Sequence, residues 1–464
     1  MDQANAARPT SLYPDVAERR REQRAWYFYD WANSAYGTTV LTVLFSPYLA
    51  AVAETAACGA PGTPEQPCTT NLRLLGIPVS PGSLPLYVVT VSTLLSAVLL
   101  PIIGAVADRS PRKKRILAAF AWVGSAATAA MVLISGGNWQ LGTGLLLVSN
   151  LCFASSIMVY DAILCDIATP DERDAVSSRG WAFGYLGGGL LLVFNLLLVQ
   201  GHEAVGLSTS MAVRLSLLSA GVWWAAFTVI PVLRLRNRPP IAVVAKPGGL
   251  VRQSVGQLFT TLREARAYPM TLLFLAAYLF FNDGIQTVIS ASSIYSARQL
   301  GLGENVLIGT ILLVQFVAFG GALAFGKIAG RIGSRRTILG GLCVWAAIVV
   351  AAYFLPARQW LPVMLIGICI GLVLGGTQAL SRSLYSQFVP KGREAEYFSL
   401  YQACERGTSW LGTLIFGLVH QLTHSYRPAM VALIFFFGIG FVLLLLVDPR
   451  RAVRDAGNEV PRVL

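Results

Sequence analysis

Residues 104–115 read Gly-Ala-Val-Ala-Asp-Arg-Ser-Pro-Arg-Lys-Lys-Arg, in which a glycine and an aspartate precede a cluster of basic residues. The pattern recurs 222 residues later as Gly-Lys-Ile-Ala-Gly-Arg (326–331), again followed by basic residues. A second pair of segments, 170–175 and 390–395, repeats with an offset of 220 residues. Two matches with nearly the same offset indicate that the chain contains two copies of one unit.

The regions around these segments are strongly apolar. Of the 464 residues, 55% are hydrophobic and only 13% are charged, and the mean hydropathy is +0.60, which argues against a soluble globule. A helix needs about 20 apolar residues to cross a bilayer. Twelve such stretches cover residues 25–50, 83–107, 115–136, 140–166, 180–200, 212–233, 268–297, 304–329, 336–356, 359–386, 396–421 and 426–447. The sequence therefore predicts an all-α integral membrane protein of twelve transmembrane helices, six in each copy.

Positive charge is distributed unevenly around these helices. The net charge is +13, and 30 of the 36 Lys and Arg residues lie in the termini or in and beside the even-numbered loops. Because cytoplasmic loops carry an excess of Lys and Arg, both termini are predicted to be cytoplasmic. The basic clusters would then contact anionic lipid of the bilayer, and nucleic-acid binding is not expected. The first apolar run has no small-residue cleavage site after it, which predicts a retained helix and no signal peptide.

The chain divides into five regions at the predicted helix boundaries. They are a cytoplasmic N-terminal tail (1–24), a six-helix half (25–233) with a long extracytoplasmic loop (51–82), a cytoplasmic linker (234–267), a second six-helix half (268–447) and a cytoplasmic tail (448–464). Two parallel halves related by an axis along the membrane normal suit alternating access around a site between them. A binding site is therefore expected at the interface of the halves, and a monomer suffices to form it.

Ionisable side chains within the apolar stretches mark candidate functional sites, because burying charge in hydrocarbon is costly. Asp30, Asp161, Asp283, Glu405 and Arg406 meet this description, and Asp283 lies in a polar turn near the middle of its helix. A carboxylate in low-dielectric protein can exchange protons near neutral pH, so Asp30 and Asp283 are candidates for proton coupling. The alternative is that they make static hydrogen bonds between helices or cap broken helix turns. Asp161 is predicted to pair with the basic loop after the second helix.

Cysteine and histidine spacing gives weaker signals. Cys58 and Cys68 lie in the long outer loop, where an oxidising compartment could join them, but spacing alone leaves both a disulfide and two free thiols open. His420 and His424 have i, i+4 spacing without a nearby Cys or carboxylate, so no metal site is expected. The sequence has no phosphate-binding loop or dinucleotide fingerprint. No cofactor is expected, and transport would draw on an ion or solute gradient.

The segment 104–113, with the pattern Gly-x3-Asp-Arg-x2-Arg-Lys, resembles the loop between the second and third helices of the major facilitator superfamily. In that superfamily the aspartate and the basic residues form charge and helix-dipole contacts that lock the inward-closed state. Here Pro111 replaces the usual glycine. In the second copy Gly330 replaces the aspartate, so the resemblance implies a weaker second lock.

Four further motifs resemble the vacuole-effluxer branch of that superfamily, typified by the autophagy-related vacuolar amino-acid effluxers of fungi. They are Tyr-Asp-Trp-Ala-Asn-Ser (29–34), Asn-Asp-Gly-Ile-Gln-Thr-Val (282–288), Gly-Gly-Thr-Gln-Ala-Leu-Ser-Arg-Ser (375–383) and Lys-Gly-Arg-Glu-Ala (391–395). They extend over nearly the whole chain. The resemblance implies the major facilitator fold and facilitated or proton-linked movement of small solutes, with export of amino acids such as leucine and tyrosine in the fungal members.

These observations together predict a transporter and not an enzyme. The expected activity is secondary active or facilitative export of small polar solutes, in particular amino acids, with protons as a candidate coupling ion. An exporter of drugs or sugars is the alternative, followed by a membrane receptor, a scaffold or an integral-membrane enzyme. The expected host is the inner membrane of a prokaryote or the vacuolar membrane of a fungus.

Two sets of residues are assigned to this activity. The residues expected around the solute path are Asp30, Asn33, Asn282, Asp283, Gln286, Gln378, Glu405 and Arg406. The residues expected at the inner gate are Gly104, Asp108, Arg109, Arg112, Lys113, Asp161, Glu172, Arg173 and Arg331.

Overall fold

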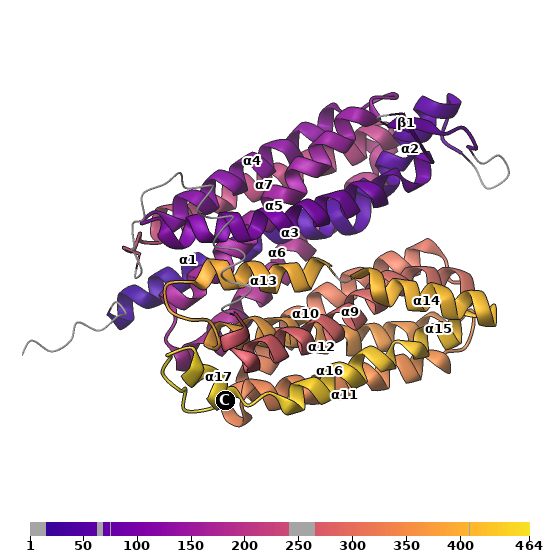
Figure 1. The fold of residues 1–464 in the computed structure, drawn as a ribbon. Helices are drawn as coiled ribbons and strands as arrows, with labels where there is room; N and C mark the ends of the chain where they lie inside the picture. The colour runs from indigo at the N-terminus through magenta and orange to yellow at the C-terminus, as the bar shows by residue number, and fades with distance from the viewer. Residues whose placement is uncertain (1–14, 63–67, 75, 241–264, 408) are drawn as a thin grey trace, which may run out of the picture.

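In the part of the chain that the structure describes, long helices form a bundle and two short strands pair in a hairpin. The computed structural model describes residues 15–62, 68–74, 76–240, 265–407 and 409–464 (Figure 1). The N-terminal half contains α1 (Val16–Ala35), the π-helix η1 (Tyr36–Leu44), α2 (Phe45–Cys58), α3 (Leu84–Arg109), α4 (Lys113–Ala130), α5 (Trp139–Ile167), α6 (Arg173–Gln200) and α7 (Thr209–Arg234). The C-terminal half contains α9 (Pro269–Ile294), the π-helix η7 (Tyr295–Gln299), α10 (Glu304–Ile332), α11 (Ser334–Tyr353), α12 (Trp360–Gln387), α13 (Glu394–Gly407), α14 (Ser409–Thr423), α15 (Tyr426–Ala432), α16 (Ile434–Leu446) and α17 (Pro449–Asp455).

Short elements join these helices. The 3₁₀ turns are η2 (Pro81–Ser83), η3 (Met131–Leu133), η4 (Pro170–Glu172), η5 (His202–Val205) and η6 (Ala265–Ala267). The strands β1 (Leu72–Leu74) and β2 (Ile77–Val79) pair antiparallel in the loop after α2. Of the predicted linker, residues 241–264 lie outside the described part of the chain.

Within the described residues, eleven helical segments are long and apolar enough to cross a membrane. The remaining predicted crossing, over residues 396–421, corresponds to α13 and α14, which follow one another on either side of residue 408 (Figure 1). Large apolar side chains on the helix surfaces are exposed, among them Leu94, Leu197 and Phe435, as expected where helices face lipid. The prediction of an all-α membrane protein with two six-helix halves is confirmed.

The first transmembrane helix is longer than its apolar pattern indicates. It continues over 43 residues, whereas the apolar run predicted only residues 25–50. Its polar first turns are held by ion pairs, with Glu22 2.6 Å from Arg238 and Arg19 2.8 Å from Glu172. Hydropathy marks only the part of a helix that lies in hydrocarbon, so these turns were not part of the prediction.

The sequence repeat becomes a reciprocal contact between the halves. A Cβ atom on Gly104 of α3 would lie 2.7 Å from the carbonyl oxygen of Ala395, near the start of α13. A Cβ atom on Gly326 of α10 would lie 2.7 Å from the side chain of Ser178, near the start of α6. At matching positions of the two copies, a glycine therefore allows one half to approach the other closely.

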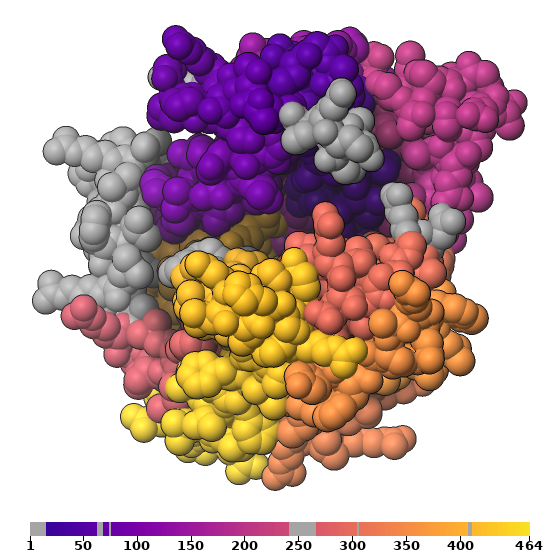
Figure 2. All heavy atoms as spheres, turned by 90° about the vertical axis from the view of Figure 1, so that its right-hand side faces the viewer, coloured from indigo at the N-terminus to yellow at the C-terminus, as the bar shows by residue number. Residues whose placement is uncertain are grey.

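The halves meet at one end of the bundle and part at the other. The start of α1 and the C-terminal helix α17 lie at the closed end, on the left in Figure 1. Hydrogen bonds between the halves occur there, including one of 2.6 Å from Arg173 to the carbonyl oxygen of Ser386. Figure 2, which looks onto the opposite end, shows the halves separated by a hollow. That the closed end faces the cytoplasm stays a prediction from charge.

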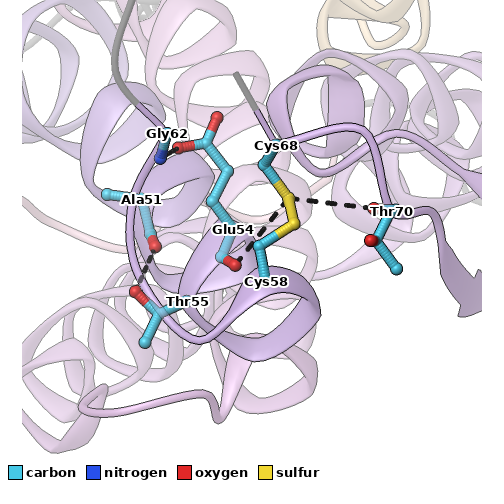
Figure 3. Close-up of a disulfide and its surroundings, with 7 residues drawn as sticks. All are labelled: Ala51, Glu54, Thr55, Cys58, Gly62, Cys68 and Thr70. Carbon is cyan, nitrogen blue, oxygen red and sulfur yellow. Dashed lines mark hydrogen bonds between the residues drawn. A yellow bond between two sulfur atoms is a disulfide. The ribbon is translucent and has the colours of Figure 1, made fainter. Parts of the chain in front are cut away.

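The loop after α2, predicted to lie on the outer side, contains a disulfide. Cys58, the last residue of α2, is bonded to Cys68 across a sequence separation of 10 residues. Figure 3 shows Glu54 beside this bridge, where its carboxylate accepts a hydrogen bond of 2.9 Å from the backbone amide of Gly62. Of the two alternatives that the spacing left open, the structure shows the bonded one.

Candidate solute cavity and inner gate

A cavity lies at the interface of the two halves. Its volume is about 210 Å³, smaller than the pockets that hold drug-sized ligands and large enough for a small solute. Its walls come from α1, η1, α5 and α6 of the N-terminal half and from α10, α12 and α13 of the C-terminal half. Its charged lining residues are Asp30, Asp161, Arg382, Glu405 and Arg406. Ionisable groups of both halves thus converge on one space.

Arg382 of α12 is the cation at the centre of this lining, and it was not among the predicted site residues. Its side chain is only 3% exposed. The guanidinium donates hydrogen bonds of 3.2 Å to Asp30 Oδ2 and to Asp161 Oδ1. Asp30 also accepts a hydrogen bond of 2.7 Å from the Tyr160 hydroxyl. Since both carboxylates belong to the N-terminal half, Arg382 forms an ion cluster across the interface, with two acidic groups around one basic group.

The partner predicted for Asp161 was wrong. Besides Arg382, its carboxylate accepts a hydrogen bond of 3.0 Å from Gln402. The basic loop after the second membrane helix instead reaches Asp166, which lies 3.6 Å from Lys113. Asp166 is more than one helical turn closer to the end of α5, and this distance along the helix decides which carboxylate meets the loop.

Glu405 and Arg406 line the same cavity without an ion pair to another side chain within 4 Å in the described part of the chain. The Glu405 carboxylate accepts a hydrogen bond of 3.0 Å from Gln402. The Arg406 guanidinium donates to Gln402 Oε1 at 3.3 Å and to Asn150 Oδ1 at 3.4 Å, and lies 5.1 Å from the centre of the Phe153 ring. Both charges are therefore solvated by neutral groups at the cavity wall.

Two neutral donors of the lining lack a partner. Asn33 Nδ2 and Trp181 Nε1 are buried and make no hydrogen bond with any described residue. An unpaired buried donor costs free energy. A ligand with acceptor atoms in the cavity would satisfy both groups.

Two of the predicted path residues, Asn282 and Gln378, lie behind the residues that line the cavity. Asn282 donates to the carbonyl oxygen of Glu405 at 3.1 Å and accepts from Gln378 at 2.8 Å. Gln378 in turn accepts from the Tyr278 hydroxyl at 3.3 Å. These contacts connect α9 and α12 to α13, so they position the charged part of the wall. Gln286 is half-buried in α9 and does not line the cavity.

Asp283 also lies away from the cavity lining. Its carboxylate accepts a hydrogen bond of 2.9 Å from the backbone amide of Gly412, in the first turns of α14. A Cβ atom on Gly412 would lie 3.1 Å from the other carboxylate oxygen. A carboxylate at the start of a helix satisfies free amides and interacts favourably with the helix dipole, so the geometry is that of a cap between α9 and α14.

The contacts at the predicted inner gate are centred on Asp108, at the end of α3. Its two carboxylate oxygens accept hydrogen bonds of 2.9 Å from the backbone amides of Ala395 and Glu396, so it caps α13 of the other half. Lys113 lies between three carboxylates, 3.5 Å from Asp108, 3.3 Å from Glu394 and 3.6 Å from Asp166. Together with the close approach at Gly104, these contacts seal α3 against α13.

The other predicted gate residues divide into two groups. Arg173 crosses the interface through its bond to Ser386. Glu172 bonds to Arg19 within the N-terminal half, at 2.8 and 2.9 Å. Arg112 and Arg331 are exposed, and Arg109 is half-buried at the end of α3. In the second copy, where Gly330 replaces the aspartate, the link comes from Asp174 of α6, which accepts a hydrogen bond of 2.6 Å from the Ser334 hydroxyl of α11.

The chain is similar to known transporters in both sequence and fold. The family profile described as "Vacuole effluxer Atg22 like" matches residues 18–457. An uncharacterised MFS-type transporter of Bacillus subtilis, YxiO, is 31% identical over 95% of this chain and 98% of its own length. Autophagy-related protein 22-1 of Penicillium rubens is 25% identical over 97% of this chain and 92% of its own length. The crystal structure of the major facilitator superfamily transporter FucP in the outward conformation shares the fold, with a TM-score of 0.65 at 11% identity over 93% of this chain and 99% of that one.

Proposed function

This chain belongs to the vacuole effluxer Atg22-like family of major facilitator superfamily transporters, and we propose that it exports amino acids or similarly small zwitterions by alternating access. Its cavity lies between the halves that such a mechanism moves against one another. With the inner end closed and the opposite end hollowed (Figure 2), the cavity would be accessible from the outer side in this conformation.

The observation that carries the proposal is the pair Glu405 and Arg406. An α-amino acid presents an ammonium and a carboxylate within a few ångströms, and charge-assisted hydrogen bonds are the strong ones. Arg406 would bind the carboxylate and Glu405 the ammonium. Since both groups are now solvated only by neutral partners, binding a zwitterion would break no ion pair of the protein.

The neutral groups of the wall would complete recognition. The free amide of Asn33 suits a second carboxylate oxygen of the solute, and the aromatic residues Phe153, Trp181 and Tyr185 line the same space. Aromatic walls accept apolar and aromatic side chains alike. A transporter that tolerates several neutral amino acids is therefore the form of the proposal we favour.

Proton coupling is a second part of the proposal. The cavity lining holds three carboxylates, Asp30, Asp161 and Glu405, against two guanidinium groups, Arg382 and Arg406. If all were ionised, one negative charge would remain uncompensated in a low-dielectric site, which is costly. One proton shared by this cluster would remove that cost. We assign coupling to the cavity carboxylates and give Asp283 the capping role that its contact with Gly412 supports.

Uptake into proteoliposomes tests the proposal. A labelled mixture of neutral amino acids is offered with and without an imposed pH gradient, with empty liposomes as the baseline. The expected result is saturable uptake that the pH gradient stimulates and that Arg406→Gln lowers by about tenfold or more, the effect of losing a charge-assisted bond. Arg336→Gln is the matched control, because Arg336 is exposed on α11.

Competition separates the alternatives in the same assay. Unlabelled amino acids should suppress uptake, whereas sugars and lipophilic drugs at equal concentration should not. Uptake at the rate of empty liposomes for every amino acid would reject amino-acid transport. Uptake that only a sugar or a drug suppresses would transfer the assignment to that class of solute.

A further inference from the structure

Arg382 occupies a socket built entirely by the opposite half. Besides Asp30 and Asp161, the guanidinium donates to the side-chain and backbone oxygens of Ser177 in α6, at 2.9 and 3.0 Å. Each of these hydrogen bonds leads from α12 of the C-terminal half to α1, α5 or α6 of the N-terminal half. An arginine that depends on the other half for its partners is stable only while the halves are together.

Aromatic rings form the walls of this socket. The Arg382 guanidinium carbon lies 4.8 Å from the centre of the Trp26 ring and 5.4 Å from those of Tyr160 and Trp181. These distances permit cation–π attraction, which strengthens when the cation is desolvated. All three rings belong to the N-terminal half, so they add to the attraction across the interface.

Gly180 provides the space for the socket. A Cβ atom at this position would lie 2.7 Å from Asp30 Oδ2 and 3.1 Å from Arg382 Nη2. Any larger residue would therefore displace the carboxylate from the guanidinium. A second bridge lies beside the socket, where the Ser177 hydroxyl donates to the carbonyl oxygen of Ala379 at 2.7 Å.

We infer that Arg382 is a positioning residue that holds the inner end of the transporter closed, and that its withdrawal from the socket is the step that lets the cavity open inward. The inference rests on the proposed alternating access and adds the link between cavity and gate. Asp30 and Asp161 line the cavity and also hold Arg382. A proton or a cationic group that neutralises them from the cavity would weaken the hold on Arg382, and the inner end would open in response.

A native thiol can report this opening without any solute. The Cys165 sulfur of α5 lies 3.8 Å from the carbonyl oxygen of Ser386 in α12, at the closed inner interface. Separation of the halves would expose it to a maleimide reagent. The reporter protein keeps Cys165 and the Cys58–Cys68 disulfide, while Cys152, Cys343, Cys369 and Cys404, the other free cysteines of the described chain, are replaced by alanine.

The experiment measures the maleimide labelling rate of Cys165 in the purified full-length reporter. Arg382→Gln should raise that rate by about tenfold or more, because a change of about 1.4 kcal/mol in the opening equilibrium changes it tenfold. Arg382→Lys retains the charge without the planar fork and should give an intermediate rate. Arg336→Gln, the exposed arginine of α11, should label at the rate of the unmodified reporter.

A second variant keeps the test valid if removal of the arginine impairs folding. Gly180→Ala leaves every charge in place but crowds the socket, and it should also raise the rate. Its control is Gly320→Ala, since a Cβ atom on Gly320 would have no neighbour within 4 Å. The thermal unfolding temperature and the size-exclusion elution profile of each variant are measured as well. Values that match the unmodified reporter confirm that labelling reports opening of a folded protein.

The possible results are decisive in either direction. Faster labelling of folded Arg382→Gln or Gly180→Ala protein than of its control supports the inference. Labelling of both at the control rate would overturn it. Because the reaction needs no solute, the absence of amino-acid transport in proteoliposomes would leave this result unaffected, and the two proposals can fail separately.

Discussion

Asp108 in the N-terminal half caps the helix that begins at Glu394 in the C-terminal half, accepting a backbone hydrogen bond of 2.9 Å from Glu396. The amides at the start of a helix lack partners within the helix, so the acceptor is supplied by the other half. The cap exists only while the inner end is closed. Closure of the gate therefore depends on hydrogen bonds from the free backbone amides of α13 to Asp108.

Removing this cap should favour the open inner gate. Asp108→Ala leaves two buried amides unsatisfied and also withdraws a carboxylate from Lys113, and loss of a cap costs about 0.5–2 kcal/mol. We expect faster labelling of Cys165 in the reporter protein. Asp15→Ala, which removes an exposed N-cap of α1, is the control. A labelling rate equal to that of the control would show that the cap does not contribute to closure.

Substitution of the two glycines of the repeat, Gly104 and Gly326, by alanine should open the inner gate to different extents. In Gly104→Ala the new methyl group would meet backbone atoms of Ala395, which cannot rotate away. In Gly326→Ala it would meet the Cβ and Oγ atoms of Ser178, of which the hydroxyl can rotate away and Cβ cannot. We expect Gly104→Ala to raise Cys165 labelling more than Gly326→Ala, with Gly320→Ala as the reference. The reverse order would contradict the geometry.

Transport assays should distinguish the role of the cavity residue Glu405 from that of Asp283, which caps α14. Glu405→Gln should lower amino-acid uptake by about tenfold, since it removes the proposed partner of the ammonium group. Asp283→Asn should retain most uptake, because the amide oxygen can still accept from Gly412. Counterflow exchange provides the check on this assignment. If Asp283→Asn lost gradient-driven uptake but kept counterflow, Asp283 would be the coupling residue that the sequence predicted.

The disulfide should stabilise the outer loop without affecting the inner gate. For a separation of 10 residues, the chain-entropy treatment gives a contribution of about 2–3 kcal/mol. Replacing Cys58 and Cys68 by serine should lower the thermal unfolding temperature while Cys165 labelling stays unchanged. A maleimide gel-shift assay with and without reductant verifies that the bond is present in the starting protein.

The fold was accessible from the sequence because its signals are local or repeated. Runs of about 20 apolar residues define membrane helices without knowledge of their neighbours. The matching offsets of the two glycine motifs indicate the duplication. The extent of the first helix was less accessible, since ion pairs with the linker and with Glu172 maintain it beyond the apolar run.

The site was harder to predict because its partners are distant in the chain. Arg382 lies four residues before the predicted end of its helix, so the charge pattern groups it with the other basic residues of the predicted inner side. In the structure it meets Asp161 across 221 positions. The partner of Asp283 is a backbone amide, which carries no sequence signal. One available signal was the run of Ser381, Arg382 and Ser383 within an apolar helix, since intramembrane arginine is costly without a partner.

The reciprocal contacts at Gly104 and Gly326 limit how the two copies can change. Each half supplies a glycine that packs against a surface of the other half. A substitution at either glycine is therefore tolerated only if the contacting surface of the other half changes to accommodate it. Drift after duplication would then be correlated between them. A chimera that joins the first half of one relative to the second half of another would therefore be mismatched at the inner gate.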